Sequence, residues 1–357
     1  MFKSAKNLLE ITKITTTQKG SQMITDAIHS LCRKENLSFK QAKTTMDLIM
    51  EGKVSDVQIA AFLTALACKG ESIDEITASV RSLKEHCDKL ECGEVLEIVG
   101  TGGDGSHSFN ISSTASLIIA SGGVKVAKHG NRAFSSKCGA ADVFEALGVN
   151  ITLPKQKAQS LIKDIGFCFL FAQNYHSAMK NVAPVRKELA IRTIFNIIGP
   201  LCNPANPQMQ IMGVYEQRLL APMAKVLQNL GVKRALVVYG LDKLDEVSLS
   251  APTQIYEVNG DKIDTYTIAP QDFGYEVCDR AALKGGDAKE NATILLDILN
   301  GKDKGAKRAV ACLNAGAGLY LAGSAKSIKE GVKLAQDLID NGKAQQKLEE
   351  LIAKSNQ

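Results

Sequence analysis

The sequence predicts an α/β protein in which a small all-helical domain is joined to a larger domain with a mainly parallel central sheet. Residues 21–91 carry only helical periodicity, whereas from Val95 onward short apolar runs alternate with helical patterns. Of the 357 residues, 45% are apolar and 23% are charged. This composition is typical of a globular protein and excludes collagen-like, coiled-coil and disordered chains.

Four short helices are predicted in the first domain. Ser38 begins the second helix, and the third is an Ala-rich segment from Val54 to Cys68. Ser72, followed three residues later by Glu75, is a capping-box pattern and begins the fourth. The absence of any strand pattern here indicates an all-helical domain.

Short apolar runs ending near turn residues predict buried strands at Val95–Val99, Val124–Ala127, Phe167–Phe171, Gln210–Val214 and Ala235–Tyr239. Ile255–Val258 is predicted to be an edge strand. Helical patterns lie between most of these runs, as at Pro154–Ile165 and Arg218–Leu230. The region Arg280–Lys354 is predicted to form helices that close the second face of the sheet.

One segment interrupts the alternation. Asn174–Ile198 has a helical pattern and is followed by a Pro-rich crossing loop, so we expect it to rejoin the helical domain and to place a cleft at the junction. The predicted organisation is an N-terminal extension (1–20), a helical domain (21–91) joined by a helical insert (174–205), and an α/β domain (92–173 and 206–357).

Charge and cysteine content indicate the setting of the protein. The net charge of +5 is too small for a nucleic-acid footprint. The nine cysteines form no Cys-x-x-Cys pair, which favours free thiols in a reducing compartment. No apolar stretch has the length of a signal peptide or a membrane span. We therefore expect a cytoplasmic protein with no nucleic-acid or membrane partner.

A glycine-rich loop, Gly100–Gly105, follows the first predicted strand and contains Asp104. Its spacing satisfies G-x-G-x-x-G, so a dinucleotide site and a purely structural turn are both alternatives. A dinucleotide site needs an acidic residue about 20 residues further on. Here the next strand ends in the basic stretch Lys128–Arg132. Because Asp104 would repel a bare pyrophosphate, a phosphorylated ligand bridged by a metal is favoured over NAD.

Two further segments offer donors to an anion. Asn110–Thr114 precedes an apolar helical run, and the N–H groups of such a helix start suit a phosphate, although an ordinary helix cap is the alternative. Ser135–Gly139 opens another helix and adds hydroxyl and ammonium groups. Ligands of open α/β sheets bind at the carboxyl ends of the strands, so these loops are expected to converge there.

Asp245 and Glu246 follow the strand Ala235–Tyr239 at the same predicted edge. Paired carboxylates are what Mg²⁺ takes in phosphate sites, although most adjacent acidic pairs are simply solvated. His107, His129 and His176 are the histidines expected near the ligand. No Ser-His-Asp or Cys-His arrangement is visible.

The sequence resembles the anthranilate phosphoribosyltransferases, a family with a nucleoside-phosphorylase-like fold. The matching stretches are VGTGGDGSHSFNISS (Val99–Ser113), VAKHGNRAFSSKCGAAD (Val126–Asp142), NVAPVRKELAIRTIFNIIGPLCNPA (Asn181–Ala205) and LDEVSLSAPT (Leu244–Thr253). The likeness covers roughly Ile24–Ala344. It implies transfer of a phosphoribosyl group from phosphoribosyl pyrophosphate (PRPP) to anthranilate in tryptophan biosynthesis, with Mg²⁺, two ions per active site, and a homodimer formed through the helical domain.

The resemblance also implies site residues. PRPP would be held by Gly100, Gly103, Asp104, Ser108, Asn110, Ile111, Ser112, Ser113, Lys128, His129, Gly130, Asn131, Arg132, Ala133, Phe134, Ser135, Ser136 and Ala140. Anthranilate would be held by Gly100, Asn131, His176, Arg186 and Pro200, with Arg186 pairing with the carboxylate. Mg²⁺ would be held by Ser112, Asp245 and Glu246. No catalytic acid or base is assigned.

The chain departs from the family pattern at a few positions. Ser112-Ser113 stands where Ser-Thr is usual, and Cys138 and Ala140 stand where serines are usual. Asp242-Lys243-Leu244 replaces a turn that commonly contains glycine. A pyrimidine nucleoside phosphorylase is disfavoured because its Lys-His-Ser-Thr-Gly-Gly stretch is absent. The remaining alternative is a homologue of the same fold that takes another acceptor or a nucleic-acid ligand.

Overall fold

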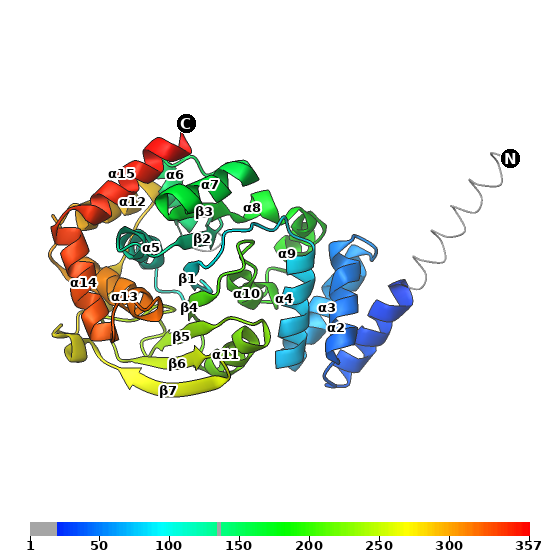
Figure 1. Ribbon diagram of the computed structural model, residues 1–357. Coiled ribbons are helices and arrows are strands. Elements are labelled where there is room, and N and C mark those ends of the chain that lie inside the picture. Colours follow the sequence, from blue (N-terminus) through cyan, green and yellow to red (C-terminus); the bar gives the residue numbers. More distant parts are fainter. Residues whose placement is uncertain (1–19, 134–136) are drawn as a thin grey trace. The chain divides into compact units, whose positions relative to one another are not determined.

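The computed structural model describes residues 20–133 and 137–357, which form two compact units (Figure 1). The helical unit comprises the described residues up to Asp88 together with His176–Cys202. The α/β unit comprises Lys89–Tyr175 and Asn203–Gln357. The predicted combination of a helical domain and a larger α/β domain is therefore confirmed.

Three capped helices follow a first helix over residues 20–32 in the helical unit. They are α2 (Phe39–Met50), α3 (Asp56–Lys69) and α4 (Ile73–Glu85). The predicted capping box at Ser72 is confirmed, since its side chain accepts the Glu75 N–H while Glu75 accepts the Ser72 N–H in return. Equivalent boxes at Ser38 and Ser55 begin α2 and α3. Local capping thus sets the start of each of these three helices.

The continuous helical pattern predicted over Asn174–Ile198 is wrong. The segment contains α8 (Ala172–Tyr175), α9 (Ala183–Leu189) and α10 (Phe195–Ile198), with a 3₁₀ turn between α8 and α9. A proline in the first turn of α9 lacks the N–H that a continuing helix would need, so a new helix begins there. Ala190, with φ of 47°, ends α9 in the left-handed region.

The α/β unit is built on a seven-stranded sheet in the order β3-β2-β1-β4-β5-β6-β7. The strands are β1 (Leu96–Gly100), β2 (Val126–Gly130), β3 (Phe167–Phe171), β4 (Met209–Gly213), β5 (Arg234–Gly240), β6 (Thr253–Asn259) and β7 (Lys262–Ile268). The first five are parallel, and β6 and β7 add antiparallel to β5. All five predicted parallel strands are present.

The prediction that Ile255–Val258 is an edge strand is wrong, because β7 covers that edge. Asn259 pairs with Lys262 across a two-residue turn in which Gly260 has a φ of 58°. Residues along β7 are exposed or only half-buried, so its sequence carries no apolar run. The edge strand is consequently polar, as exposed edges usually are.

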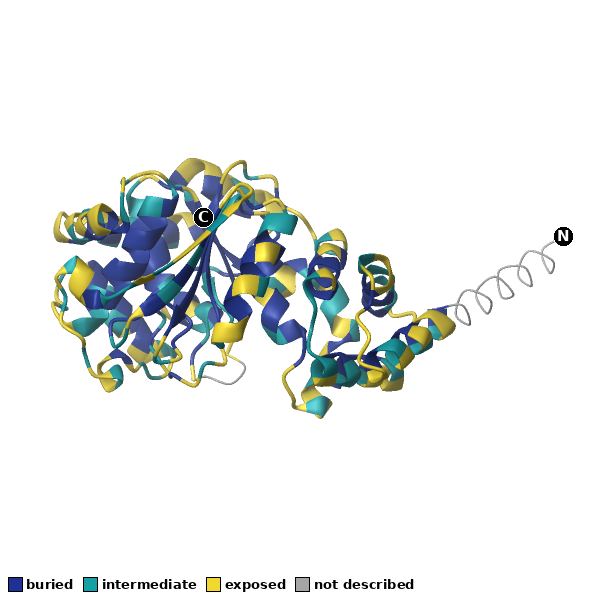
Figure 2. Ribbon diagram, turned by 90° about the horizontal axis from the view of Figure 1, so that it is seen from below, coloured by how far each residue is buried: buried dark blue, intermediate teal, exposed yellow. Residues whose placement is uncertain are grey.

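Helices cover both faces of this sheet. The remaining helices of the unit are α5 (Ile111–Ser121), α6 (Ala140–Ala146), α7 (Lys155–Ile165), α11 (Leu220–Asn229), α12 (Ala288–Leu299), α13 (Ala306–Leu321), α14 (Ile328–Asp340) and α15 (Lys343–Ser355). α5 and α13 lie against one face, and α11 packs on β5 and β6 at the other (Figure 1). The parallel strands and the inner helices form the buried core (Figure 2).

The chain leaves β1 and β4, which are neighbours, in opposite directions along the sheet. β1 continues through α5 to β2, whereas β4 continues through α11 to β5. Such a reversal opens a crevice between the carboxyl ends of the two strands, where open α/β sheets bind ligands. Within residues 20–133 and 137–357, no helix is both long and apolar enough to cross a membrane.

Candidate active site

The glycine loop leaves β1 at the crevice. Gly102, Gly103 and Gly105 have φ of 71°, 73° and 70°, in the left-handed region that favours glycine. Thr101 N–H donates to the carbonyl of Gly213 at the end of β4 at 3.0 Å. The loop is therefore fixed to both strands of the crevice at its first residues.

Asp245 lies against the ends of both strands. Its Oδ2 accepts the backbone N–H of Gly102 at 2.6 Å. A Cβ on Gly100 would lie 2.3 Å from the same oxygen, and a Cβ on Gly213 would lie 1.6 Å from the Asp245 carbonyl oxygen. Glycine is thus required at the ends of both β1 and β4 for the acidic loop to sit between them.

Asp104 of the glycine loop also contacts Asp245. Its Oδ1 accepts the N–H and hydroxyl of Ser106 at 3.0 and 2.9 Å, and its Oδ2 accepts the Asp245 N–H at 3.4 Å. Ser106 also donates its hydroxyl to Ser108 Oγ at 3.2 Å. The two carboxylates of Asp104 and Asp245 are therefore neighbours.

The acidic pair is buried and lies beside a third carboxyl group, that of Asp104. Asp245 and Glu246 are 8% and 7% exposed. Burial and the neighbouring Asp104 raise the pKa of Asp245 to about 7. Burial and the charge of Asp245 raise the pKa of Glu246 to about 8, although Lys128 and a hydrogen bond from Ser112 act in the opposite direction.

Lys128 is a buried cation beside these carboxylates. Its Nζ donates to the Ile98 carbonyl at 2.6 Å and to Ser112 Oγ at 3.2 Å. Only 2% of Lys128 is exposed, and burial lowers the pKa of its ammonium group while Glu97 and Glu246 oppose that shift. Ser112 therefore connects the ammonium group to Glu246.

The donor set fits a hard divalent cation. Carboxylate and hydroxyl oxygens are the ligands that Mg²⁺ prefers, and a cation would stabilise the ionised pair Asp245–Glu246. No group of three or more His, Cys, Asp or Glu side chains within residues 20–133 and 137–357 could hold a metal by itself. A cation bound here would need further oxygen ligands, which the phosphates of a substrate and water supply in Mg²⁺ sites.

The amino terminus of α5 faces this region without a side-chain cap. The N-cap residue Asn110 makes no hydrogen bond to the first turn of the helix. Its Oδ1 instead accepts from Asn291 Nδ2 at 2.9 Å and from Cys138 Sγ at 3.4 Å. The first-turn N–H groups of a helix have no partner within the helix, and the helix dipole favours an anion at this end.

The loop after β2 is held by backbone contacts. His129 N–H donates to the buried Glu97 at 3.1 Å, and Gly130 lies so near Ala140 that a Cβ would be 3.0 Å from its methyl group. The Asn131 carbonyl accepts the Ala141 N–H at 3.2 Å. Thus, β2 and the start of α6 lie in direct contact.

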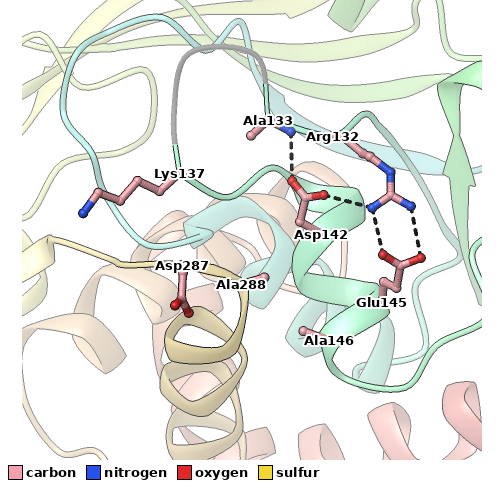
Figure 3. A pocket seen from close by; sticks show the side chains of 8 residues that line it. All are labelled: Arg132, Ala133, Lys137, Asp142, Glu145, Ala146, Asp287 and Ala288. Atoms are coloured by element: carbon pink, nitrogen blue, oxygen red, sulfur yellow. Dashed lines mark hydrogen bonds and ion pairs between the residues drawn. The ribbon is translucent and has the colours of Figure 1, made fainter.

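Arg132 is held by two acidic side chains of α6. It makes two hydrogen bonds to Glu145, at 2.8 and 3.0 Å, and a third to Asp142 at 3.1 Å (Figure 3). Asp142 also accepts the Ala133 N–H at 2.9 Å. These residues line a pocket of 640 Å³ together with Lys137, Ala146, Asp287 and Ala288.

The remaining predicted site residues either fall outside the described residues or belong to the helical unit. Phe134, Ser135 and Ser136 lie outside the described residues. His176, Arg186 and Pro200 belong to the helical unit. In that unit the Arg186 guanidinium lies 5.2 Å from the ring centroid of Phe195, and burial lowers the pKa of Arg186 and of His176. Pro200 is buried.

Sequence reasoning missed polar residues that hold these loops from a distance. Asn314 on α13 and Asn291 on α12 are fully buried amides that bond to the acidic loop and to Asn110, respectively. Glu97 on β1 is likewise buried and holds the loop after β2. A single polar residue in a buried apolar segment is the signal that could have identified them.

Comparisons with known proteins agree on one family. Residues 92–345 match the model of the glycosyl transferase family, a/b domain, and residues 25–87 match that of the glycosyl transferase family, helical bundle domain. The chain is 56% identical over 335 residues to an anthranilate phosphoribosyltransferase from Methanobrevibacter smithii, which covers 94% of this chain and 100% of the relative.

Solved structures show the same likeness. An anthranilate phosphoribosyltransferase from Thermus thermophilus is 42% identical with a TM-score of 0.88, over 93% of this chain and 100% of that one. The enzyme of that name from Saccharomyces cerevisiae, in complex with PRPP and Mg, is 29% identical with a TM-score of 0.86, over 93% and 98%.

Proposed function

The chain belongs to the anthranilate phosphoribosyltransferase family, and on that premise we propose that the carboxyl edge of its sheet is the active site. The enzyme transfers the phosphoribosyl group of PRPP to the amine of anthranilate, giving N-(5-phosphoribosyl)anthranilate and pyrophosphate for tryptophan biosynthesis. The single observation that carries the placement is the contact of Asp245 with Gly102 at the crevice between β1 and β4.

PRPP is bound by backbone N–H groups as much as by side chains. The glycine loop and the uncapped amino terminus of α5 both present N–H groups to an anion, and Lys128 adds an ammonium group. We assign to PRPP the residues Gly100, Gly103, Asp104, Ser108, Asn110, Ile111, Ser112, Ser113, Lys128, His129, Gly130, Asn131, Arg132, Ala133 and Ala140, and also Phe134, Ser135 and Ser136, which lie outside the described residues.

Ser112, Asp245 and Glu246 hold the Mg²⁺, with two ions in each site. Burial of the two carboxylates beside Asp104 supports this assignment, because a divalent cation stabilises their ionised forms. When bound with PRPP, Mg²⁺ neutralises the charge that develops on the departing pyrophosphate. We therefore expect Mg²⁺ to bind together with the phosphates of PRPP.

Anthranilate is bound by Gly100, Asn131, His176, Arg186 and Pro200. The planar guanidinium of Arg186 suits the carboxylate of anthranilate, since it can donate two parallel hydrogen bonds. Stacking on Phe195 holds that guanidinium in the helical unit. This side chain gives the site its specificity for an acidic aromatic amine.

The reaction proceeds by positioning and electrostatics. The bond between C1 and the pyrophosphate oxygen breaks through an oxocarbenium-like transition state, and the amine nitrogen of anthranilate forms the new bond to C1. Lys128 and the N–H groups of the glycine loop stabilise the leaving charge. The amine is a weak nucleophile that needs alignment rather than activation, so no general base is assigned.

We further assign a homodimer formed through the helical unit and a cytoplasmic location. The exposed Met23 and Val57 of the helical unit, 41% and 79% exposed, support an apolar contact between copies. All nine cysteines are free, which suits a reducing compartment.

Loss of anthranilate fluorescence tests the activity directly. The purified chain is mixed with PRPP, Mg²⁺ and anthranilate, and the fluorescence decrease is followed while pyrophosphate is measured in parallel. We expect one pyrophosphate per anthranilate consumed. An unchanged signal, with a thermal shift on adding another aromatic amine or a nucleic acid, would instead support a homologue with a different acceptor or ligand.

A further inference from the structure

We propose that Asn314 is a positioning residue that sets the orientation of the acidic pair Asp245–Glu246. Asn314 lies in the middle of α13 and is fully buried. Its Oδ1 accepts the Val247 N–H at 3.0 Å, and its Nδ2 donates to the Val247 carbonyl at 2.9 Å. One side-chain amide therefore pairs with both backbone groups of the residue that follows Glu246.

This pairing fixes a peptide plane. The N–H of Val247 belongs to the same planar peptide unit as the carbonyl of Glu246, so holding one holds the other. The second bond, to the Val247 carbonyl, prevents rotation at the far side of the same residue. Since the Cα of Glu246 belongs to the same planar unit, these bonds also fix the point at which the Glu246 side chain leaves the backbone.

Asn314 is itself held in place. Its Nδ2 also donates to the carbonyl of Val310 one turn earlier in α13, at 2.9 Å. α13 packs against α5 and against β4 and β5, so the amide is carried by the core of the α/β unit. The acidic loop is thus anchored to a buried helix by a residue 67 positions away in the chain.

A second set of contacts, made by Asp242, holds the acidic loop on both sides of the pair. Asp242 accepts the hydroxyls of Ser248, at 3.0 Å, and of Ser250, and its Oδ1 accepts the Leu244 N–H at 3.4 Å. Asp242 thereby joins a residue before the pair to two residues after it, whereas Asn314 holds Val247 itself. Because none of the Asp242 hydrogen bonds involves the N–H or carbonyl of Val247, they cannot replace the lost amide.

An apolar residue at position 314 would leave a buried donor and a buried acceptor of Val247 unpaired. Buried backbone groups are rarely left unpaired, so the loop would move to satisfy them. A shift of this loop turns the carboxylates away from the cation. The inference rests on the proposed metal role of Asp245 and Glu246.

Metal binding in the presence of PRPP tests the proposal without turnover. Mn²⁺ is titrated into the full chain with PRPP, and free Mn²⁺ is measured by electron paramagnetic resonance. We expect Asn314→Leu to weaken Mn²⁺ binding by about tenfold or more, which corresponds to about 1.4 kcal/mol. Asn314→Asp keeps an acceptor for the Val247 N–H but replaces the donor by a carboxylate oxygen that faces the Val247 and Val310 carbonyls, so we expect weaker Mn²⁺ binding in this variant too.

Leu161→Ala is the matched control. Leu161 is a buried residue of α7, which packs on β3 and α15 rather than on the acidic loop. The substitution should lower the melting temperature but leave the Mn²⁺ dissociation constant within about twofold of that of the parent chain. An equal loss of Mn²⁺ binding in Leu161→Ala would overturn the positioning role, as would unchanged binding in Asn314→Leu.

Two further outcomes are decisive. If Asn314→Leu does not fold, Mn²⁺ binding by Asn314→Asp tests the proposal instead. Unchanged Mn²⁺ binding in that variant contradicts the proposal. The apparent KM for Mg²⁺ should rise in parallel with the Mn²⁺ dissociation constant, while the KM for anthranilate stays unchanged. Parent-like Mn²⁺ binding in the double variant Asp245→Asn, Glu246→Gln would show that the metal role itself is wrong, and it would overturn both proposals.

Discussion

Gly102 donates its backbone N–H to Asp245 Oδ2 at 2.6 Å, although the two residues are 143 positions apart in the sequence. The bond joins the glycine loop after β1 to the acidic loop after β5. Each loop therefore depends on the other for its position. A substitution in either loop is expected to weaken the binding of PRPP and of Mg²⁺ together, because this hydrogen bond positions both loops.

Gly100→Ala should inactivate the enzyme. Its Cβ would lie 2.3 Å from Asp245 Oδ2, so the carboxylate must move by roughly 1 Å. A displacement of that size in an active site costs about 100-fold, and we expect this loss in kcat/KM. Gly305→Ala is the control, because its Cβ meets only an ordinary contact at 3.4 Å. Equal activities of the two variants would contradict the close approach.

Unfolding across pH should reveal the buried acidic pair. The pKa of Asp245 is about 7 and that of Glu246 about 8 in the folded chain, above the unfolded values of about 3.9 and 4.3. Between these values the folded state binds more protons than the unfolded state, so the pair's contribution to the free energy of unfolding falls as pH rises.

The double variant Asp245→Asn, Glu246→Gln removes that contribution. We therefore expect the stability of the parent relative to the variant to decrease from about pH 4 to about pH 8, and to level off above it. Urea unfolding without metal at several pH values measures the difference. A difference that stays constant over this range would show that the carboxylates are not held in a desolvated environment.

Lys243→Gly should keep or increase stability. Lys243 has a φ of 74°, in the region where a non-glycine residue costs about 1–2 kcal/mol. Glycine loses about 0.5–1 kcal/mol through the entropy of the unfolded chain, so the net gain is zero to about 1.5 kcal/mol. Lys125 is an exposed residue that is not among those with positive φ. Lys125→Gly is therefore the control, and it should be destabilising. Urea unfolding compares the two, and similar losses would be inconsistent with strain at Lys243.

Arg186→Lys should weaken anthranilate binding selectively. A lysine keeps the charge but cannot donate two parallel bonds to a carboxylate or stack on Phe195 as a planar group. We expect the KM for anthranilate to rise about tenfold, with the KM for PRPP within about twofold of the parent. Steady-state fluorescence assays give both constants. A rise in the KM for PRPP alone would place Arg186 at the other substrate.

The parts of the fold that the sequence predicts are those with strong local patterns. β3 has the predicted bounds because Phe167–Phe171 is a continuous buried apolar run. β7 has no such run, since it is an exposed strand at the end of the sheet beside β6, and its position follows from hairpin geometry. The helix predicted across Pro184 fails because one proline restarts the helix.

In the site, too, features with a local sequence pattern are predicted and tertiary contacts are not. Glycine and acidic motifs are visible locally, and the order of strands and helices places them at one edge of the sheet. The support for Val247 by Asn314 spans 67 residues, and no local pattern indicates it. The hydrogen bond from Asn291 Nδ2 to Asn110 Oδ1 is likewise a tertiary contact, between residues 181 positions apart. Such contacts arise only when α12 and α13 pack beside the loops.

The Mg²⁺ dependence of turnover in the double variant Asp245→Asn, Glu246→Gln tests the central assignment most directly. Circular dichroism first establishes that the variant is folded, and anthranilate consumption is then measured with saturating PRPP over increasing Mg²⁺. Loss of the two charges should remove most turnover, by at least about 100-fold at any Mg²⁺ concentration. Turnover near that of the parent, with unchanged Mg²⁺ dependence, would contradict the account.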